Sequence, residues 1–114
     1  MGETIDVDFW ETDQHSAEAT IAKLIPRAQA KVYAFLNVVR ETRPGTLHSL
    51  KKTKQERLWE YKTRLPEGGL RLLFAYGKSG KLWCLGAFIK RNDREGNKLL
   101  KNPYESLAIA ASQR

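Results

Sequence analysis

The chain has 114 residues, of which 41% are hydrophobic and 29% are charged, so we expect one globular domain over residues 1–114 rather than a disordered chain. No apolar run approaches the ~20 residues that cross a bilayer, and the acidic N-terminus is unlike a signal peptide, so we expect a cytoplasmic protein with no membrane partner. The net charge is +7, but the first 22 residues contain six acids and no Lys or Arg. The remaining residues therefore have a net charge of +13. Such a charge attracts RNA, DNA, an anionic membrane or an acidic protein.

The first half of the chain predicts a strand followed by helices. Residues 4–9 alternate between apolar and acidic side chains, as a half-buried strand does. Ser16 is a suitable N-cap, and apolar residues then recur every three or four positions to about residue 40. Because Pro26 interrupts this pattern, we expect a break with a second helix starting there rather than one kinked helix. Residues 46–56 are expected to form a polar, basic connection.

The second half predicts an antiparallel meander and a terminal helix. Pro66–Gly69 is expected to be a four-residue loop, and Ser79-Gly80 a two-residue loop. A short helix is expected to follow Asn102, with Pro103 in its first turn. The order of elements predicts an α+β fold with the helices packed on one face of the sheet. The three expected strands are residues 57–65, 70–77 and 81–91.

These loops imply a register that gathers cations on one face of the sheet. Arg64 is expected opposite Arg71, and Arg71 opposite Phe88. Like charges directly opposite each other cost about 0.2–1 kcal/mol per pair, so their convergence suggests a bound anion; the alternative is that long side chains splay into water. The predicted cationic face holds Glu60, Lys62, Arg64, Arg71, Phe88 and Lys90, and the face toward the helices holds Trp59, Tyr61, Leu70, Leu72, Phe74, Trp83 and Leu85.

Three short motifs follow one another along these strands: Trp59-Glu60-Tyr61-Lys62, Gly69-Leu70-Arg71 and Phe88-Ile89-Lys90. Over residues 16–112 the chain resembles the RelE/HigB toxin superfamily, most closely its HigB-like, phage-associated branch. The resemblance implies the toxin of a type II toxin–antitoxin system, which cuts messenger RNA in the ribosomal A site and inhibits translation without metal or cofactor. A 2′-hydroxyl attacks its own 3′-phosphate, which requires a proton acceptor, cations for the phosphorane charge and a proton donor.

The resemblance also implies catalytic roles for individual residues. Arg71 matches the arginine of the G-x-R motif and is expected to be the main phosphate stabiliser, because a guanidinium donates two parallel hydrogen bonds to phosphate. Lys62 is expected to bind phosphate or remove the proton, and Lys90 and Arg91 to contact phosphate. Tyr104 is expected to stack on a base or assist proton transfer; the alternative is that it packs the terminal helix onto the sheet.

Further residues are assigned to RNA binding or to other roles. Arg64 and Phe88 belong to the RNA-binding face, and His48 is a second candidate for the general base, behind Lys62. Cys84 is expected to be a buried small hydrophobe, and one cysteine with two histidines predicts no metal site. Ribosomal RNA is the expected target of the loop lysines Lys51, Lys52 and Lys54.

Two departures from the family pattern bear on these roles. Lys62 replaces the commoner arginine, and the stretch 92–101 is longer than in compact relatives, which leaves the position of Tyr104 open. Two rival hypotheses assume the same fold. The first is a ParE-like toxin that binds DNA gyrase, and the clustered cations argue against it. The second is a non-catalytic nucleic-acid-binding module. The toxin hypothesis predicts three partners: messenger RNA, the ribosome and a cognate antitoxin. The antitoxin of a HigB-like toxin is usually a helix-turn-helix protein.

Overall fold

The computed structural model describes residues 3–114 and confirms the predicted α+β order of strand, helices, meander and helix. One five-stranded sheet has the order β1-β5-β4-β3-β2, in which β1 runs parallel to β5 and the other pairs are antiparallel. Within residues 3–114, no helix is long and apolar enough to span a membrane. The elements are β1 (Val7–Phe9), α1 (Ala17–Ala22), α2 (Pro26–Arg40), β2 (Lys51–Lys52), β3 (Trp59–Leu65), β4 (Gly68–Tyr76), β5 (Leu82–Lys90), α3 (Asp93–Leu99), the kinked turn η1 (Leu100–Glu105) and α4 (Ser106–Ala111).

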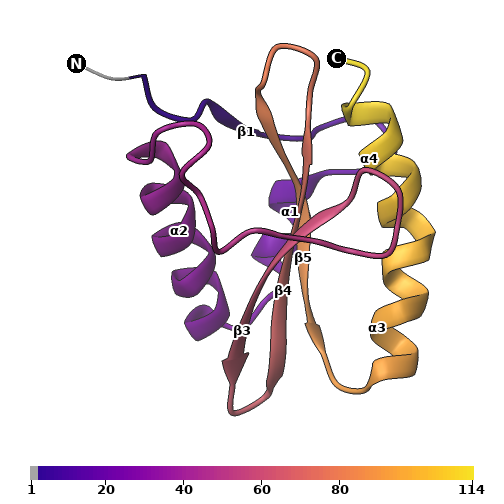
Figure 1. The fold of residues 1–114 in the computed structure, drawn as a ribbon. Coiled ribbons are helices and arrows are strands. Elements are labelled where there is room, and N and C mark those ends of the chain that lie inside the picture. The colour runs from indigo at the N-terminus through magenta and orange to yellow at the C-terminus, as the bar shows by residue number, and fades with distance from the viewer. Residues whose placement is uncertain (1–2) are drawn as a thin grey trace.

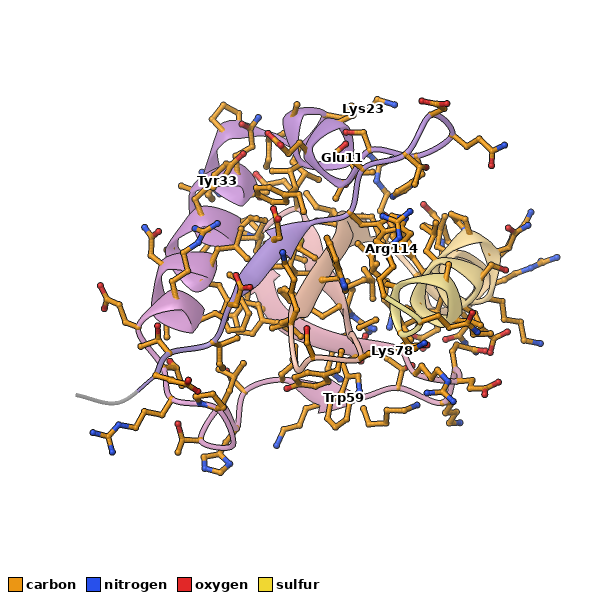
Figure 2. The ribbon with its side chains drawn as sticks, turned by 90° about the horizontal axis from the view of Figure 1, so that it is seen from above. Glu11, Lys23, Tyr33, Trp59, Lys78 and Arg114 are labelled. Carbon is orange, nitrogen blue, oxygen red and sulfur yellow. The ribbon has the colours of Figure 1, made fainter. Side chains whose placement is uncertain are left out.

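Helices cover both faces of the sheet, so the expectation that they pack on one face is wrong. In Figure 1, α2 lies on one side of the strands and the α3–α4 segment on the other, and Figure 2 shows the same layers from above. Two hydrophobic clusters fill these layers, one around Leu72 and Phe74 with α1 and α2, the other around Leu73 and Ala75 with the C-terminal segment. The run 72–75 is buried without interruption because β4 is a central strand covered on both faces.

The helical half of the chain begins and breaks where the sequence predicts. The Ser16 hydroxyl caps α1 by accepting a hydrogen bond from the Ala19 backbone N–H at 3.0 Å. The second helix begins at Pro26, whose missing N–H costs nothing in the first turn. The expected break at this proline is therefore confirmed.

The first hairpin of the meander has a tighter turn than predicted. Leu65 pairs with Gly68, so the connection is the two-residue turn Pro66-Glu67, and Arg71 lies opposite Lys62 instead of Arg64. The predicted register is therefore wrong by two residues. Because side chains alternate with a period of two, this error moves no residue to the other face.

The second hairpin contains a bulge that the sequence analysis did not predict. Arg71 pairs with Phe88 as expected, but the register shifts between Leu73 and Phe74, where Leu85 is the extra residue. The turn is also longer than Ser79-Gly80, since the Gly77 N–H donates to the Lys81 carbonyl oxygen at 2.7 Å. Beyond a bulge the alternation of faces reverses. Trp83 and Leu85 consequently pack against the C-terminal segment, opposite to the predicted face.

Two segments predicted as connections have regular structure. The connection 46–56 contains β2, which pairs with the start of β3. The C-terminal helical segment starts at Asp93, because the Asn92 side chain accepts a hydrogen bond from the Glu95 N–H at 2.8 Å. Asn102, the predicted N-cap, instead lies within the kink at η1 with extended backbone angles.

Candidate nucleic-acid interface

The predicted cationic face exists and lies on the side of the sheet toward the C-terminal segment. Arg71 of β4 has Lys62 of β3 and Phe88 of β5 as its direct cross-strand neighbours. Lys90 lies opposite Gly69, two positions further along β5 and on the same face. The meander thus brings cations from three strands together.

These cations surround a groove of about 640 Å³ beside the turn between β3 and β4, which we call the hairpin groove. Gly68 and Gly69 form part of its wall; an added Cβ at Gly69 would meet nothing within 4 Å, whereas one at Gly68 would lie 2.6 Å from the Lys90 carbonyl oxygen. The groove gathers four of the five predicted catalytic residues and one predicted RNA-binding residue. Its charged lining consists of Lys62, Arg64, Arg71, Lys90, Arg91 and the single carboxylate of Asp93.

Arg71 is held in place by a carboxylate. Its Nη1 donates to Oε2 of Glu60 at 2.8 Å, and the two side chains are only 13% and 10% exposed. Lys62 approaches the other oxygen of Glu60 at 3.9 Å but is 56% exposed. A guanidinium has five N–H donors, so the bond to Glu60 leaves others for a phosphate. Glu60 therefore orients Arg71 and places one negative charge beneath the cations.

Lys90 is also restrained, by the helix that follows it. Its ammonium pairs with the Asp93 carboxylate, and its aliphatic chain lies across Gly96, where an added Cβ would be 2.9 Å from the lysine Cδ. The hydrogen bond from Lys90 lowers the pKa of Asp93. Lys90 is thus less available to a ligand than Lys62, Arg64 and Arg91, which are exposed around the same groove.

Tyr104 and Phe88 lie within the second hydrophobic cluster. Tyr104 is only 4% exposed, and burial raises its pKa to about 12. The two rings stack on each other, with centroids 5.9 Å apart and planes 24° apart. The Tyr104 ring therefore has no free face for a base, and the structure supports the alternative in which it packs the C-terminal segment onto the sheet. Half-buried Phe88 likewise stacks on protein instead of presenting an open ring.

The other predicted residues occupy different surroundings. Lys51, Lys52 and Lys54 are all exposed, and the ammonium of Lys52 also donates to backbone carbonyl oxygens of its own loop, at 2.9 Å to Thr53 and 2.5 Å to Gln55. His48 is exposed in the loop before β2 and lines neither this groove nor its neighbours. Cys84 is fully buried, as predicted, and burial raises the pKa of its thiol to about 12.

No role in the site was predicted for Asn92 and Asp93, which line the groove, or for Glu60, which pairs with Arg71 beside it. Glu60 was predicted to share the cationic face with Lys62, but its pairing with Arg71 was not predicted. Asn92 and Asp93 were assigned to a connection. The sequence pattern that indicates a helix here is an N-cap residue followed by acids in the first turn. Among residues 3–114, no group of three or more His, Cys, Asp and Glu side chains is arranged to hold a metal ion.

Comparison with known families supports the resemblance seen in the motifs. Residues 19–113 match the family described as Phage derived protein Gp49-like. The chain belongs to this Gp49-like family. No curated protein sequence matches it.

Two solved structures share the fold of this Gp49-like protein. A double arginine-to-alanine mutant of the E. coli toxin RelE in the free state is 16% identical, with a TM-score of 0.52, and the match covers 90% of this chain and 99% of RelE. The same mutant in complex with an antitoxin RelBc peptide is also 16% identical, with a TM-score of 0.54 and coverage of 87% and 97%. These matches confirm the predicted RelE-like fold.

Proposed function

We propose that this Gp49-like protein is the toxin of a type II toxin–antitoxin system and acts as a ribosome-dependent, metal-independent messenger RNA endoribonuclease. The observation that carries the proposal is the hairpin groove, where cations from three strands meet around Arg71. Such a groove suits a phosphodiester, because several guanidinium and ammonium groups can share the charge of one phosphate. Likeness of fold to a protein named as the toxin RelE supports the same assignment.

In the proposed reaction, the ribose 2′-oxygen forms a bond to the adjacent phosphorus, and the bond from phosphorus to the 5′-oxygen of the next nucleotide breaks. The 2′-hydroxyl proton goes to a base, and the leaving oxygen receives a proton from an acid. Arg71, oriented by Glu60, stabilises the charge that develops on the equatorial phosphate oxygens. Lys62, exposed beside Arg71, contacts the same phosphate, and Arg64 and Arg91 hold the strand on either side.

We also propose an antitoxin partner for the chain, of the helix-turn-helix type. The RelE fold has been solved with an antitoxin peptide bound, which supports such a partner here. A search for a small DNA-binding protein encoded next to this chain, followed by co-purification, tests the pairing. If the toxin arrests growth and no neighbouring protein relieves the arrest, the antitoxin proposal fails.

The nuclease proposal is tested by cleavage of a translated messenger with and without ribosomes. Arg71→Ala is expected to lower the cleavage rate by about 10²–10³-fold, the usual loss when a donor to a developing oxyanion is removed. Arg43→Ala, which removes an exposed arginine outside the hairpin groove, is the matched control and is expected to cut normally.

Because Arg71→Ala leaves the buried Glu60 without its partner, its folding must be verified by chemical denaturation. Lys62→Ala is the second variant, since it removes an exposed cation at small cost in stability. Ribosome-dependent cuts that persist in both folded variants would refute the assignment of the groove. No cutting by the folded wild type would favour a binding module or a gyrase-directed toxin.

A further inference from the structure

A second groove, of about 470 Å³, adjoins the hairpin groove. Lys62 and Arg71 line both, so they lie at the boundary. The hairpin groove extends from this pair toward the turn between β3 and β4, whereas the second groove extends the other way, past Glu60. One wall of the second groove is the loop 52–55, which we use to name it the loop groove. The opposite wall comes from α3 and η1, and Figure 1 shows the chain between α2 and β3 crossing toward this C-terminal segment.

The loop groove is basic, and Glu60, the one acid among the described residues that line it, is already engaged. Glu60 pairs with Arg71 and lies near Lys62, so it offers little to a ligand. Lys54 and Lys101 stand on opposite walls, both exposed, and neither forms an ion pair within residues 3–114. Asn97 adds an amide with both donor and acceptor groups to the α3 wall. The loop groove therefore presents free ammonium groups on both walls.

We propose that the loop groove is a second phosphate-binding subsite, in which Lys54 and Lys101 hold phosphates that flank the one at Arg71. A single RNA strand then runs from the loop groove past Lys62 and Arg71 into the hairpin groove. This inference rests on the proposed function, because it concerns the substrate of the same site. A nucleic acid strand is favoured over an acidic peptide because the two grooves share central cations, and a phosphodiester chain supplies a charge at every nucleotide to match a continuous track.

The inference is tested by fluorescence anisotropy with a labelled, single-stranded 2′-O-methyl RNA of about 8 nucleotides, a length typical of single-strand sites. This probe lacks the attacking hydroxyl, so binding is measured apart from cleavage. The double variant Lys54→Ala/Lys101→Ala is expected to bind about tenfold more weakly. Its slope of log affinity against log salt is expected to fall by about 0.7 for each lost phosphate contact. A probe too short to reach both grooves is expected to bind the wild type and the double variant with the same affinity.

The matched control is Lys31→Ala/Lys78→Ala, which makes the same change in net charge with exposed lysines elsewhere. Lys31 lies on α2, and Lys78 lies in the turn between β4 and β5, at the other end of the sheet from the hairpin groove (Figures 1 and 2). Equal affinities and salt slopes for the two double variants would overturn the inference.

The remaining outcomes separate this inference from the proposed function. If Arg71→Ala loses cleavage and Lys54→Ala/Lys101→Ala binds RNA like its control, the nuclease proposal stands and the second subsite does not. If the Lys54 and Lys101 variant binds RNA normally but loses affinity for a polyglutamate peptide, the loop groove serves an acidic protein and the inference is overturned. If the wild type never cleaves but Lys54→Ala/Lys101→Ala binds RNA more weakly than its control, the subsite is supported in a protein that binds without catalysis.

Discussion

At Gly86 the sheet, α1 and the C-terminal segment approach one another closely. Its φ of +147° suits glycine, and a Cβ there would lie 2.7 Å from the Tyr104 hydroxyl and 2.8 Å from Thr20 Oγ1. Thr20 is itself fixed, because its hydroxyl donates to the Ala17 carbonyl at 2.7 Å and accepts from the Ala87 N–H at 3.0 Å. The missing side chain therefore allows Tyr104 to be buried.

Gly86→Ala is expected to lower the free energy of unfolding by about 2–4 kcal/mol, through backbone strain together with the clash. Gly69→Ala is the matched control in the neighbouring strand, where an added Cβ meets nothing within 4 Å, and should change stability by less than about 0.5 kcal/mol. Urea denaturation of both variants measures the difference. Equal losses would show that the close approach at Gly86 does not constrain the fold.

At the scale of elements, α3 decides how much of the cationic face is exposed. Asn92 starts the helix next to the last residues of β5, so Asp93 is placed where it pairs with Lys90. The helix then crosses above the face, with Gly96 against the Lys90 chain and Asn97 at the rim of the loop groove. One capping residue thereby shapes both grooves.

Asn92→Ala is expected to cost about 1 kcal/mol, the usual effect of removing an N-cap side chain. Asn102→Ala is the matched control, since among residues 3–114 no hydrogen bond involves the Asn102 side chain, and it should be nearly neutral. Thermal or denaturant unfolding of the two variants compares them directly. A larger loss of stability for Asn102→Ala than for Asn92→Ala would instead support the helix start at Asn102 that the sequence predicted.

At the scale of the molecule, each of the two hydrophobic clusters encloses a titratable group. Cys84 lies in the cluster toward α1 and α2, and Tyr104 in the one toward the C-terminal segment. Burial raises both pKa values to about 12, from ordinary values of 9.0 and 10.0. Ionisation of either group is therefore coupled to unfolding.

Stability is expected to be unaffected by these two groups below pH 9 and to fall as pH rises toward 12. The sign follows because the unfolded chain releases both protons at lower pH than the folded chain, so alkali favours unfolding. Denaturant titrations across this pH range measure the slope. Cys84→Ala is expected to be less stable at neutral pH but to show a shallower alkaline decline, and an unchanged decline would exclude the thiol as a cause.

The sequence by itself determined the order of the first strand, the two helices, the meander and a terminal helix, together with the break at Pro26, the buried Cys84 and the face shared by Lys62, Arg71 and Lys90. These features depend on local patterns: hydrophobic periodicity, capping residues, proline geometry and the two-residue alternation of strands. The predicted face remained correct although the register of the first hairpin was wrong by two residues, because a shift of two leaves each side chain on the same face.

Only the tertiary structure decided which cations are free and what covers them. The bulge at Leu85, the second helical layer and the burial of Tyr104 depend on packing between segments far apart in the chain, which no local pattern records. The same holds for the pairing of Arg71 with Glu60 and of Lys90 with Asp93, because an ion pair depends on distance and exposure in the folded molecule. A charge is read from sequence, whereas its availability to a ligand is set by the fold.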